Sequence, residues 1–180
     1  MQEFETTVLD INVTEIEEKL QQLWAVVSED TTLMKRRVFD IQAHADGKGK
    51  RFRLRQKWDK TTLTYKERWG TEIWSTHELE VRVGDFDTMA EILQKLEREV
   101  MVYQENKRKV YLLNDIEFCI DSRPKIPTYL EIESTSIEKV KEWLELLWLT
   151  GKDEWDLGVI ETYAKYGIDL HSYPVLKFDE

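Results

Sequence analysis

The amino-acid sequence predicts an α+β domain, because two patterns recur along its 180 residues. Short segments alternate charged and apolar side chains with a period of two, as strands do when one face is polar. Other segments repeat apolar residues at helical spacing behind residues that cap helices. No composition shift or repeat divides the chain, so residues 1–180 are expected to form a single domain.

The alternating segments predict eight strands and the periodic segments predict four helices. The strands are expected at Gln2–Asp10, Leu33–Gln42, Lys50–Gln56, Thr62–Trp69, His77–Val83, Lys107–Leu113, Ile116–Asp121 and Thr128–Glu133. Capping boxes at Thr14 and Thr135, each with a glutamate three residues later, predict the starts of two helices. The other helices are expected over Asp85–Val100 and Asp156–Tyr166, and Asn114-Asp115 is expected to form a two-residue hairpin.

Charged side chains of both signs share faces of these strands. The third strand places Arg51, Arg53 and Arg55 on one face, and the fourth adds Lys66. Carboxylates repeat the spacing in three pairs, Glu3/Glu5, Glu78/Glu80 and Glu131/Glu133. A sheet curled with its charged faces inward would form a polar tunnel, with arginines for phosphates and carboxylates for divalent metals. Solvated sheet faces are the alternative, and they explain one such pair better than they explain the repetition.

Composition limits the partners that the chain can have. The net charge of −10 opposes general affinity for nucleic acids or acidic membranes, although a local arginine cluster can still bind a small phosphate compound. No apolar run is long enough to span a membrane, and the single cysteine, Cys119, excludes an internal disulfide. We therefore expect a cytoplasmic protein. Trp143, Trp148 and Trp155 fit a homodimer interface and a monomer core equally well.

Several short motifs, taken in order, resemble the CYTH domains, also called triphosphate tunnel metalloenzymes. Glu3-Phe4-Glu5 resembles the opening ExExK signature, and the later strands resemble the basic and acidic strands of the family in the same order. These later matches are Phe52–Arg55, Leu63–Lys66, Glu78–Val81, Arg108 with Tyr111, Ile120-Asp121, Ile126–Glu133 and Tyr163–Asp169. The resemblance covers nearly the whole chain.

The resemblance implies an eight-stranded antiparallel β-barrel that forms a tunnel, flanked by helices, with Mg²⁺ or Mn²⁺ as cofactor. It implies a small-molecule triphosphate as substrate, and the family includes triphosphatases and class IV adenylyl cyclases. Carried over residue by residue, the metal ligands would be Glu3, Glu5, Asp121, Glu131 and Glu133. The substrate ligands would be Arg53, Arg55, Lys66 and Arg108, with Glu78 and Glu80 lining the tunnel as metal ligands or as partners of the arginines. Glu3, Glu5, Arg53, Arg55 and Lys66 would carry the catalysis.

One residue departs from the family pattern. Thr7 stands where the signature has lysine, so one cation is missing from the predicted tunnel, and Lys35 or Arg37 are candidates to replace it. Three functions follow as hypotheses: a metal-dependent triphosphatase, an adenylyl cyclase that makes cyclic AMP from ATP, and a non-catalytic triphosphate- or polyphosphate-binding protein. Thr7 is the feature that favours the third.

Overall fold

The alternating segments form strands in the computed structural model, which describes residues 4–43, 49–68, 76–97, 100–155 and 157–179. The eight predicted strands are β1 (Phe4–Val8), β2 (Val26–Ala43), β3 (Gly49–Lys57), β4 (Lys60–Arg68), β5 (Thr76–Val83), β6 (Val100–Leu113), β7 (Ile116–Ser122) and β8 (Tyr129–Ser134). Two short strands, β9 (Asp153–Trp155) and β10 (Val175–Leu176), have no counterpart in the alternating pattern. The helices are α1 (Val13–Gln22), α2 (Phe86–Lys95), α3 (Ile137–Leu146) and α4 (Val159–Lys165), with a short 3-10 helix at Leu170–Ser172.

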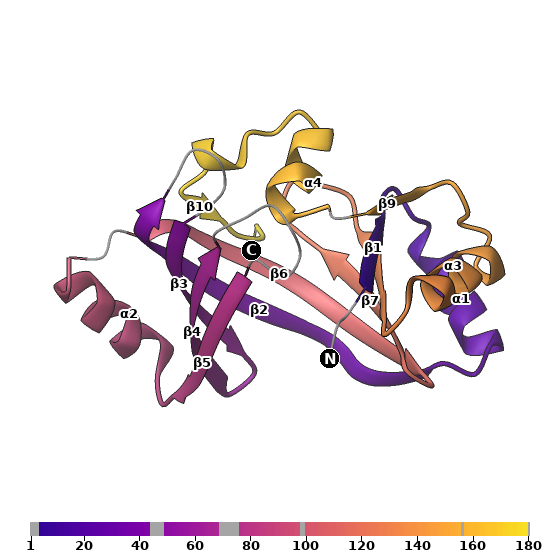
Figure 1. Cartoon of the computed structure of the whole chain (residues 1–180), viewed down its shortest axis with the longest axis horizontal. Helices are drawn as coiled ribbons and strands as arrows, with labels where there is room; N and C mark the ends of the chain where they lie inside the picture. Colours follow the sequence, from indigo (N-terminus) through magenta and orange to yellow (C-terminus); the bar gives the residue numbers. More distant parts are fainter. Residues whose placement is uncertain (1–3, 44–48, 69–75, 98–99, 156, 180) are drawn as a thin grey trace. The chain divides into compact units, whose positions relative to one another are not determined.

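Hydrogen bonding orders the strands β5-β4-β3-β2-β6-β7-β8-β1-β9, and β10 pairs with β6 (Figure 1). The pairings from β5 to β2 and from β6 to β9 are antiparallel, whereas β10 joins β6 in parallel. The predicted α+β class, with an antiparallel sheet and flanking helices, is confirmed. No pairing between described residues joins the end strands β5 and β9.

The chain divides into two compact units, each with its own core. Unit 1 consists of residues 1–32 and 106–170, and unit 2 consists of residues 33–105 and 171–180. The long strands β2 and β6 contribute residues to both units.

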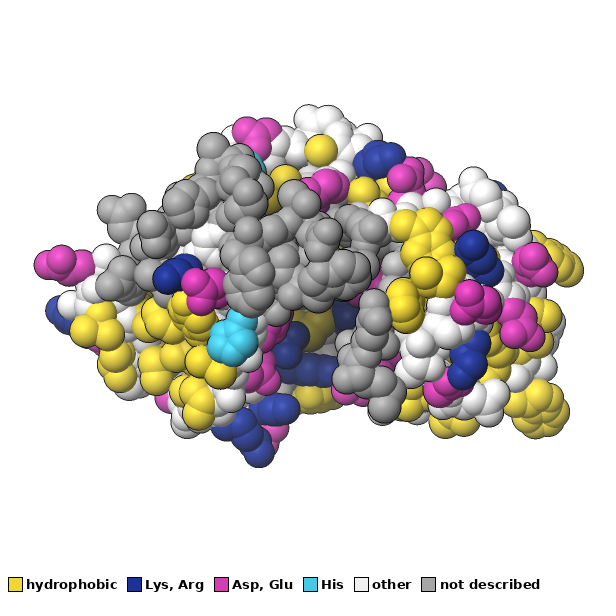
Figure 2. Space-filling view, viewed as in Figure 1, with side chains coloured by type: hydrophobic (Ala, Val, Ile, Leu, Met, Phe, Trp, Pro, Cys, Tyr) yellow, Lys and Arg dark blue, Asp and Glu magenta, His cyan; other side chains and the backbone are white. Residues whose placement is uncertain are grey.

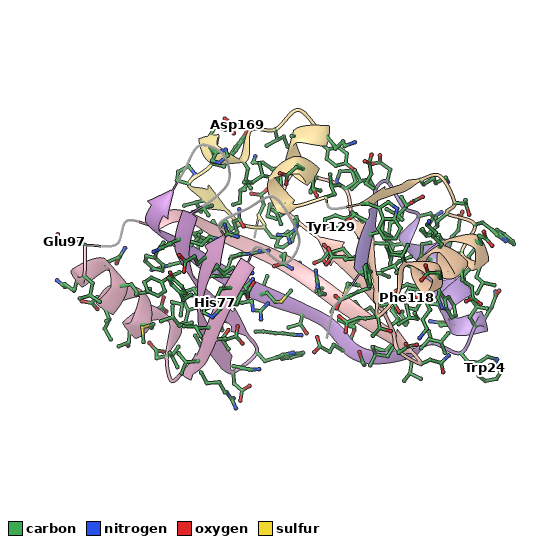
Figure 3. The ribbon with its side chains drawn as sticks, viewed as in Figure 1. Trp24, His77, Glu97, Phe118, Tyr129 and Asp169 are labelled. Carbon is green, nitrogen blue, oxygen red and sulfur yellow. The ribbon has the colours of Figure 1, made fainter. Side chains whose placement is uncertain are left out.

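The core of unit 1 lies between the apolar face of β1, β7 and β8 and the helices α1 and α3. Alternate strand residues are fully buried there, and they pack with Ile16 and Leu20 of α1 and with Val140 and Leu144 of α3. Phe118 contacts the ring of Trp143 edge-on, with 5.3 Å between the ring centroids, beside α1 and α3 (Figure 3). Because side chains alternate, the opposite face of these strands is left for polar residues.

The core of unit 2 forms where α2 covers one face of β2, β3 and β4. Phe86, Ala90 and Leu93 recur at helical spacing and pack against Phe39 and Leu54 of the strands. The opposite face of the same strands is therefore available for the charged residues of the alternating pattern.

The helix starts show where local sequence rules fail. Asn12, not Thr14, caps α1, and its side chain accepts a hydrogen bond from the backbone N–H of Glu15. Ser136, not Thr135, caps α3 and accepts from the N–H of Lys139. Asparagine and serine cap helices as well as threonine does, so the capping-box pattern alone cannot select the residue where the helix begins. The hairpin at Asn114 is confirmed, since its φ of 56° is the positive value that such turns need.

Two helices end on tryptophans in a left-handed backbone conformation. After α1, Trp24 donates its N–H to the carbonyl of Gln21, and Ala25 donates to that of Leu20. After α3, Trp148 and Leu149 repeat the arrangement. Such Schellman endings normally use glycine at the left-handed residue, whereas φ here is 66° at Trp24 and 59° at Trp148.

Replacing Trp24 by glycine is expected to stabilise the protein by about 1 kcal/mol, since glycine adopts positive φ without steric cost. The side chain is 85% exposed, so its removal sacrifices little packing. Trp24→Ala serves as the matched control, because alanine removes the ring but keeps the Cβ that causes the strain. Urea unfolding of both variants checks this prediction, and equal stability of the two variants would contradict it.

Candidate functional site

Unit 2 presents a charged face on β3, β4 and β5, opposite the face covered by α2. The strand register aligns its residues in three cross-strand rows: Arg51, Lys66 and Glu78; Arg53, Thr64 and Glu80; Arg55, Thr62 and Arg82. The rows hold five cations and two carboxylates. Figure 2 shows Lys and Arg side chains gathered at the lower ends of these strands. The excess of positive charge makes this face suitable for a polyanion.

The two carboxylates of this face pair with its cations. Lys66 donates to Glu78, and the Thr64 hydroxyl donates to Glu80 over 2.7 Å. Nη2 of Arg53 lies 4.0 Å from Oε2 of Glu80. Of the two roles left open for Glu78 and Glu80, the contacts therefore favour that of partners to the cations.

Arg53 is a cation of the charged face that is largely shielded from water. Its side chain is only 20% exposed, and its buried Nε makes no hydrogen bond within the described residues. Burial and the neighbouring charge of Arg55 lower the pKa of the Arg53 guanidinium. Burial also lowers the pKa of Lys66, against the opposing effect of Glu78. An anion placed on this face would satisfy both groups.

Lys35 and Arg37 do not belong to this face, which corrects their expected role as substitutes for the missing lysine. Arg37 stands opposite Leu54 and Lys35 opposite Gln56, on the side that α2 covers. Arg37 lies 3.7 Å from Asp87 and over the ring of Phe86. The cation of β2 that shares a face with Arg55 is Arg36.

Unit 1 presents its own charged face, on β1, β8, β7 and β6. The register aligns Glu5, Glu133 and Glu117 in one row, Thr7, Glu131 and Cys119 in the next, and Tyr129, Asp121 and Arg108 in a third. All the predicted site residues of these strands share this face except Glu3, which lies outside the described residues. Glu5 and Glu133, from the first and the last of the eight predicted strands, are direct cross-strand neighbours.

Arg108 is the centre of the buried part of this face. A single nitrogen, Nη2, forms ion pairs with both Asp121 and Glu131. Asp121 is fully buried, and its second oxygen accepts a hydrogen bond of 3.0 Å from the Asn106 amide. Burial alone would lower the pKa of Arg108, but the two carboxylates outweigh it and raise that pKa.

The surroundings of Glu131 disfavour its ionised form. Burial and the charge of Asp121 raise the pKa of Glu131 to about 8, although Arg108 acts in the opposite direction. Thr7 faces Glu131 directly across the strand pair and is 1% exposed, so no positive charge comes from β1 at this point.

The family model of the CYTH domain matches residues 2–153. The chain belongs to the CYTH domain family. This confirms the resemblance and places the chain in a family of metalloenzymes that use divalent ions.

Solved structures share the fold of this CYTH domain at low identity. The PH1012 protein of Pyrococcus horikoshii is 22% identical with a TM-score of 0.68, covering 85% of this chain and 94% of its own. A Vibrio parahaemolyticus protein proposed to be an adenylate cyclase is 14% identical with a TM-score of 0.72, covering 90% and 97%. HpAC1 of Hippeastrum, proposed to be an adenylyl cyclase and reported to have a dominant triphosphatase activity, is 17% identical with a TM-score of 0.53, covering 95% and 98%. No curated protein matches the chain.

The carboxylates of unit 1 are oxygen ligands of the kind that a divalent metal prefers. Two of them also lie close enough together to bind one ion. Among the described residues, no three acidic, histidine or cysteine side chains gather closely enough to hold an ion. Asp121 and Glu131, however, already direct an oxygen each at one positive atom, Nη2 of Arg108. Magnesium is commonly held by one or two carboxylates together with water and substrate phosphates. The pair therefore suits such an ion, with Glu5 and Glu133 on the same face.

The sequence did not indicate all the polar residues of this site. Asn106 lies two residues before Arg108 in β6, so strand alternation could have placed its side chain on the charged face. Arg123 is buried and donates from Nε to the Tyr129 hydroxyl over 2.6 Å, but it follows the end of β7, where no periodicity applies (Figure 3). Burial raises the pKa of the Cys119 thiol, which opposes a role as a nucleophile. None of the helices that the structure describes is both long and apolar enough to cross a membrane.

Proposed function

We propose that this CYTH domain is a metal-dependent hydrolase of compounds that carry a triphosphate. The observation that carries the proposal is the charged face of unit 2, where five cations meet two carboxylates. Arg53 is largely buried there, and its Nε makes no hydrogen bond to any residue that the structure describes. A desolvated guanidinium without a full anionic partner is costly unless a ligand supplies the charge. A triphosphate has the charge and the oxygens to do so.

The side chains of this face divide the binding between them. Arg53 and Arg55 would donate paired hydrogen bonds to phosphate oxygens, which the planar guanidinium suits. Lys66 would act as a point charge, held by Glu78. Thr64 orients Glu80, which in turn restrains Arg53. These contacts fix the phosphates in place before the reaction, and positioning is most of what phosphoryl transfer requires.

In the reaction, the oxygen of a water molecule forms a bond to the terminal phosphorus. The bond from that phosphorus to the bridging oxygen breaks, and its electron pair leaves with the remaining phosphate chain. The proton of the water passes to the released phosphates. Arg53, Arg55 and Lys66 stabilise the charge on the phosphate oxygens. Asp121 and Glu131, with Glu5 and Glu133 on the same face of unit 1 and Glu3 as a further proposed ligand, would hold a divalent ion. Such an ion would supply charge neutralisation and a water of lowered pKa.

Product analysis tests the proposal. The protein is incubated with tripolyphosphate and, separately, with ATP, in Mg²⁺, in Mn²⁺ and in excess chelator. Metal-dependent orthophosphate is the expected product, together with pyrophosphate from tripolyphosphate and ADP from ATP. Cyclic AMP with pyrophosphate from ATP would replace the proposal by a cyclase activity.

Adding the missing cation is expected to increase turnover. Thr7→Lys places an ammonium on the face of Glu131, where one further charge-assisted contact of about 1.5–3 kcal/mol raises kcat/KM by roughly 10- to 100-fold. Thr7→Val, which keeps the volume and adds no charge, should give no gain. Metal-dependent binding without turnover in either Thr7→Lys or the parent protein would indicate a binding module instead.

A further inference from the structure

In unit 1, one guanidinium nitrogen of Arg108 lies between two carboxylates, at a position that suits a metal cation. Nη2 forms ion pairs with Oδ2 of Asp121 and with Oε2 of Glu131, two carboxylates from adjacent strands. Both acids are largely shielded, with side-chain exposures of 0% and 15%. A positive charge between two buried carboxylate oxygens is also the arrangement that a hard divalent ion would have there.

Not every nitrogen of the Arg108 guanidinium has a partner among the described residues. Its buried Nε makes no hydrogen bond within the described residues, and its side chain is 24% exposed. The neighbouring contacts do not depend on it, because Asn106 holds the other oxygen of Asp121, and Arg123 holds Tyr129. The guanidinium can therefore leave the carboxylates while the groups around them remain in place.

We propose that Arg108 is an exchangeable counter-ion, which leaves Asp121 and Glu131 when a divalent cation takes its place and then binds the triphosphate. This inference rests on the proposed function, since it assumes that a triphosphate binds the metal-loaded face of unit 1. It assigns two successive partners to one guanidinium, and it makes binding of the metal and of the triphosphate mutually favourable.

Electrostatic repulsion supports the exchange. A guanidinium that stayed on Asp121 and Glu131 after a divalent ion entered would lie beside a second positive centre in a largely buried region. Release of Arg108 removes this repulsion, and its binding to a phosphate gives the guanidinium a new anionic partner.

The first test is the affinity for Mn²⁺ alone, measured by the electron paramagnetic resonance of free Mn²⁺ without triphosphate. Arg108→Gln removes the competing cation and is expected to bind Mn²⁺ about tenfold more tightly than the parent protein. Lys109→Gln is the matched control, because Lys109 is the next residue of β6 and pairs with Glu17 on the opposite face. Its Mn²⁺ affinity should be unchanged. A role for Arg108 that is only structural predicts equal or weaker Mn²⁺ binding by Arg108→Gln, and that result would overturn the proposal.

A second measurement uses the parent protein and so does not depend on the folding of a variant. With ¹⁵N-labelled arginine, the Nε–H resonance of Arg108, assigned from its loss in Arg108→Lys, should move on adding Mg²⁺ and return with excess chelator. Adding tripolyphosphate to the Mg²⁺-loaded protein should move it again. A resonance that ignores saturating Mg²⁺ would show that Arg108 stays on its carboxylates and would refute the exchange.

Neither measurement involves turnover, so the exchange and the proposed hydrolysis can fail separately. If Mn²⁺ binding tightens in Arg108→Gln and the Arg108 resonance responds to both ligands while no phosphate is released, the exchange is supported and hydrolysis is wrong. If phosphate is released while Arg108 responds to neither ligand, hydrolysis is supported and the exchange is wrong.

Discussion

Replacing Arg53 by glutamine is expected to lower kcat/KM for tripolyphosphate by roughly 10²- to 10³-fold, the usual effect of removing a preorganised donor from developing phosphate charge. We assign phosphate binding to Arg53 because its guanidinium is mostly buried on the charged face. Its Nε makes no hydrogen bond among the described residues. Stability should not fall, since burial and Arg55 already disfavour the charged form.

Arg37→Gln is the matched control for Arg53→Gln. It removes the same type of side chain from the same sheet, but from the face that α2 covers. Steady-state kinetics on both variants should show the large loss only for Arg53→Gln, with urea unfolding to confirm that both are folded. A similar loss in the two variants, or none in Arg53→Gln, would mean that the charged face of unit 2 does not bind the substrate.

Removing the Asp121 carboxylate is expected to destabilise the fold by about 3 kcal/mol. In Asp121→Ala, the Asn106 amide loses the buried Asp121 oxygen to which it donates, and Arg108 loses one of its two ion-pair partners among the described residues. Breaking one side of a buried charge network is costly because the remaining groups stay out of water.

Glu154→Ala measures the cost of losing a carboxylate at the surface. Glu154 forms an ion pair with Lys165 over 2.6 Å, but both side chains are more than 40% exposed. Its loss should cost no more than about 1 kcal/mol. Urea unfolding at neutral pH gives the free energy of unfolding of both variants. An equal loss of stability in Asp121→Ala and Glu154→Ala would show that the contacts of Asp121 stabilise the fold less than its burial indicates.

Strand alternation was sufficient to predict both charged faces. A period of two is a geometric property of an extended chain, so Arg53 with Arg55, and Glu131 with Glu133, must share faces wherever the strands lie. The apolar residues between them then have to form the two cores, as Leu54 and Ile132 do. The strands and both charged faces follow from that rule, whereas the helices required helical periodicity and Asp121 was identified by the family resemblance.

Alternation fails where every residue of a run has the same character. Lys35, Arg36 and Arg37 are consecutive cations, so the sequence could not show that the middle one faces the same side as Arg55. It fails also beyond strand ends, where tertiary contacts bury Arg123. The bridging of Asp121 and Glu131 by one nitrogen depends on side-chain torsions, which no spacing rule specifies.

The most direct test of the central claim is a ³¹P NMR time course of the protein with tripolyphosphate. With Mg²⁺ or Mn²⁺, the account predicts that orthophosphate and pyrophosphate appear together as tripolyphosphate disappears, that chelator stops the reaction, and that Arg53→Gln slows it without loss of folding. Tripolyphosphate that persists unchanged with either metal, and that the folded protein does not bind, would contradict the account.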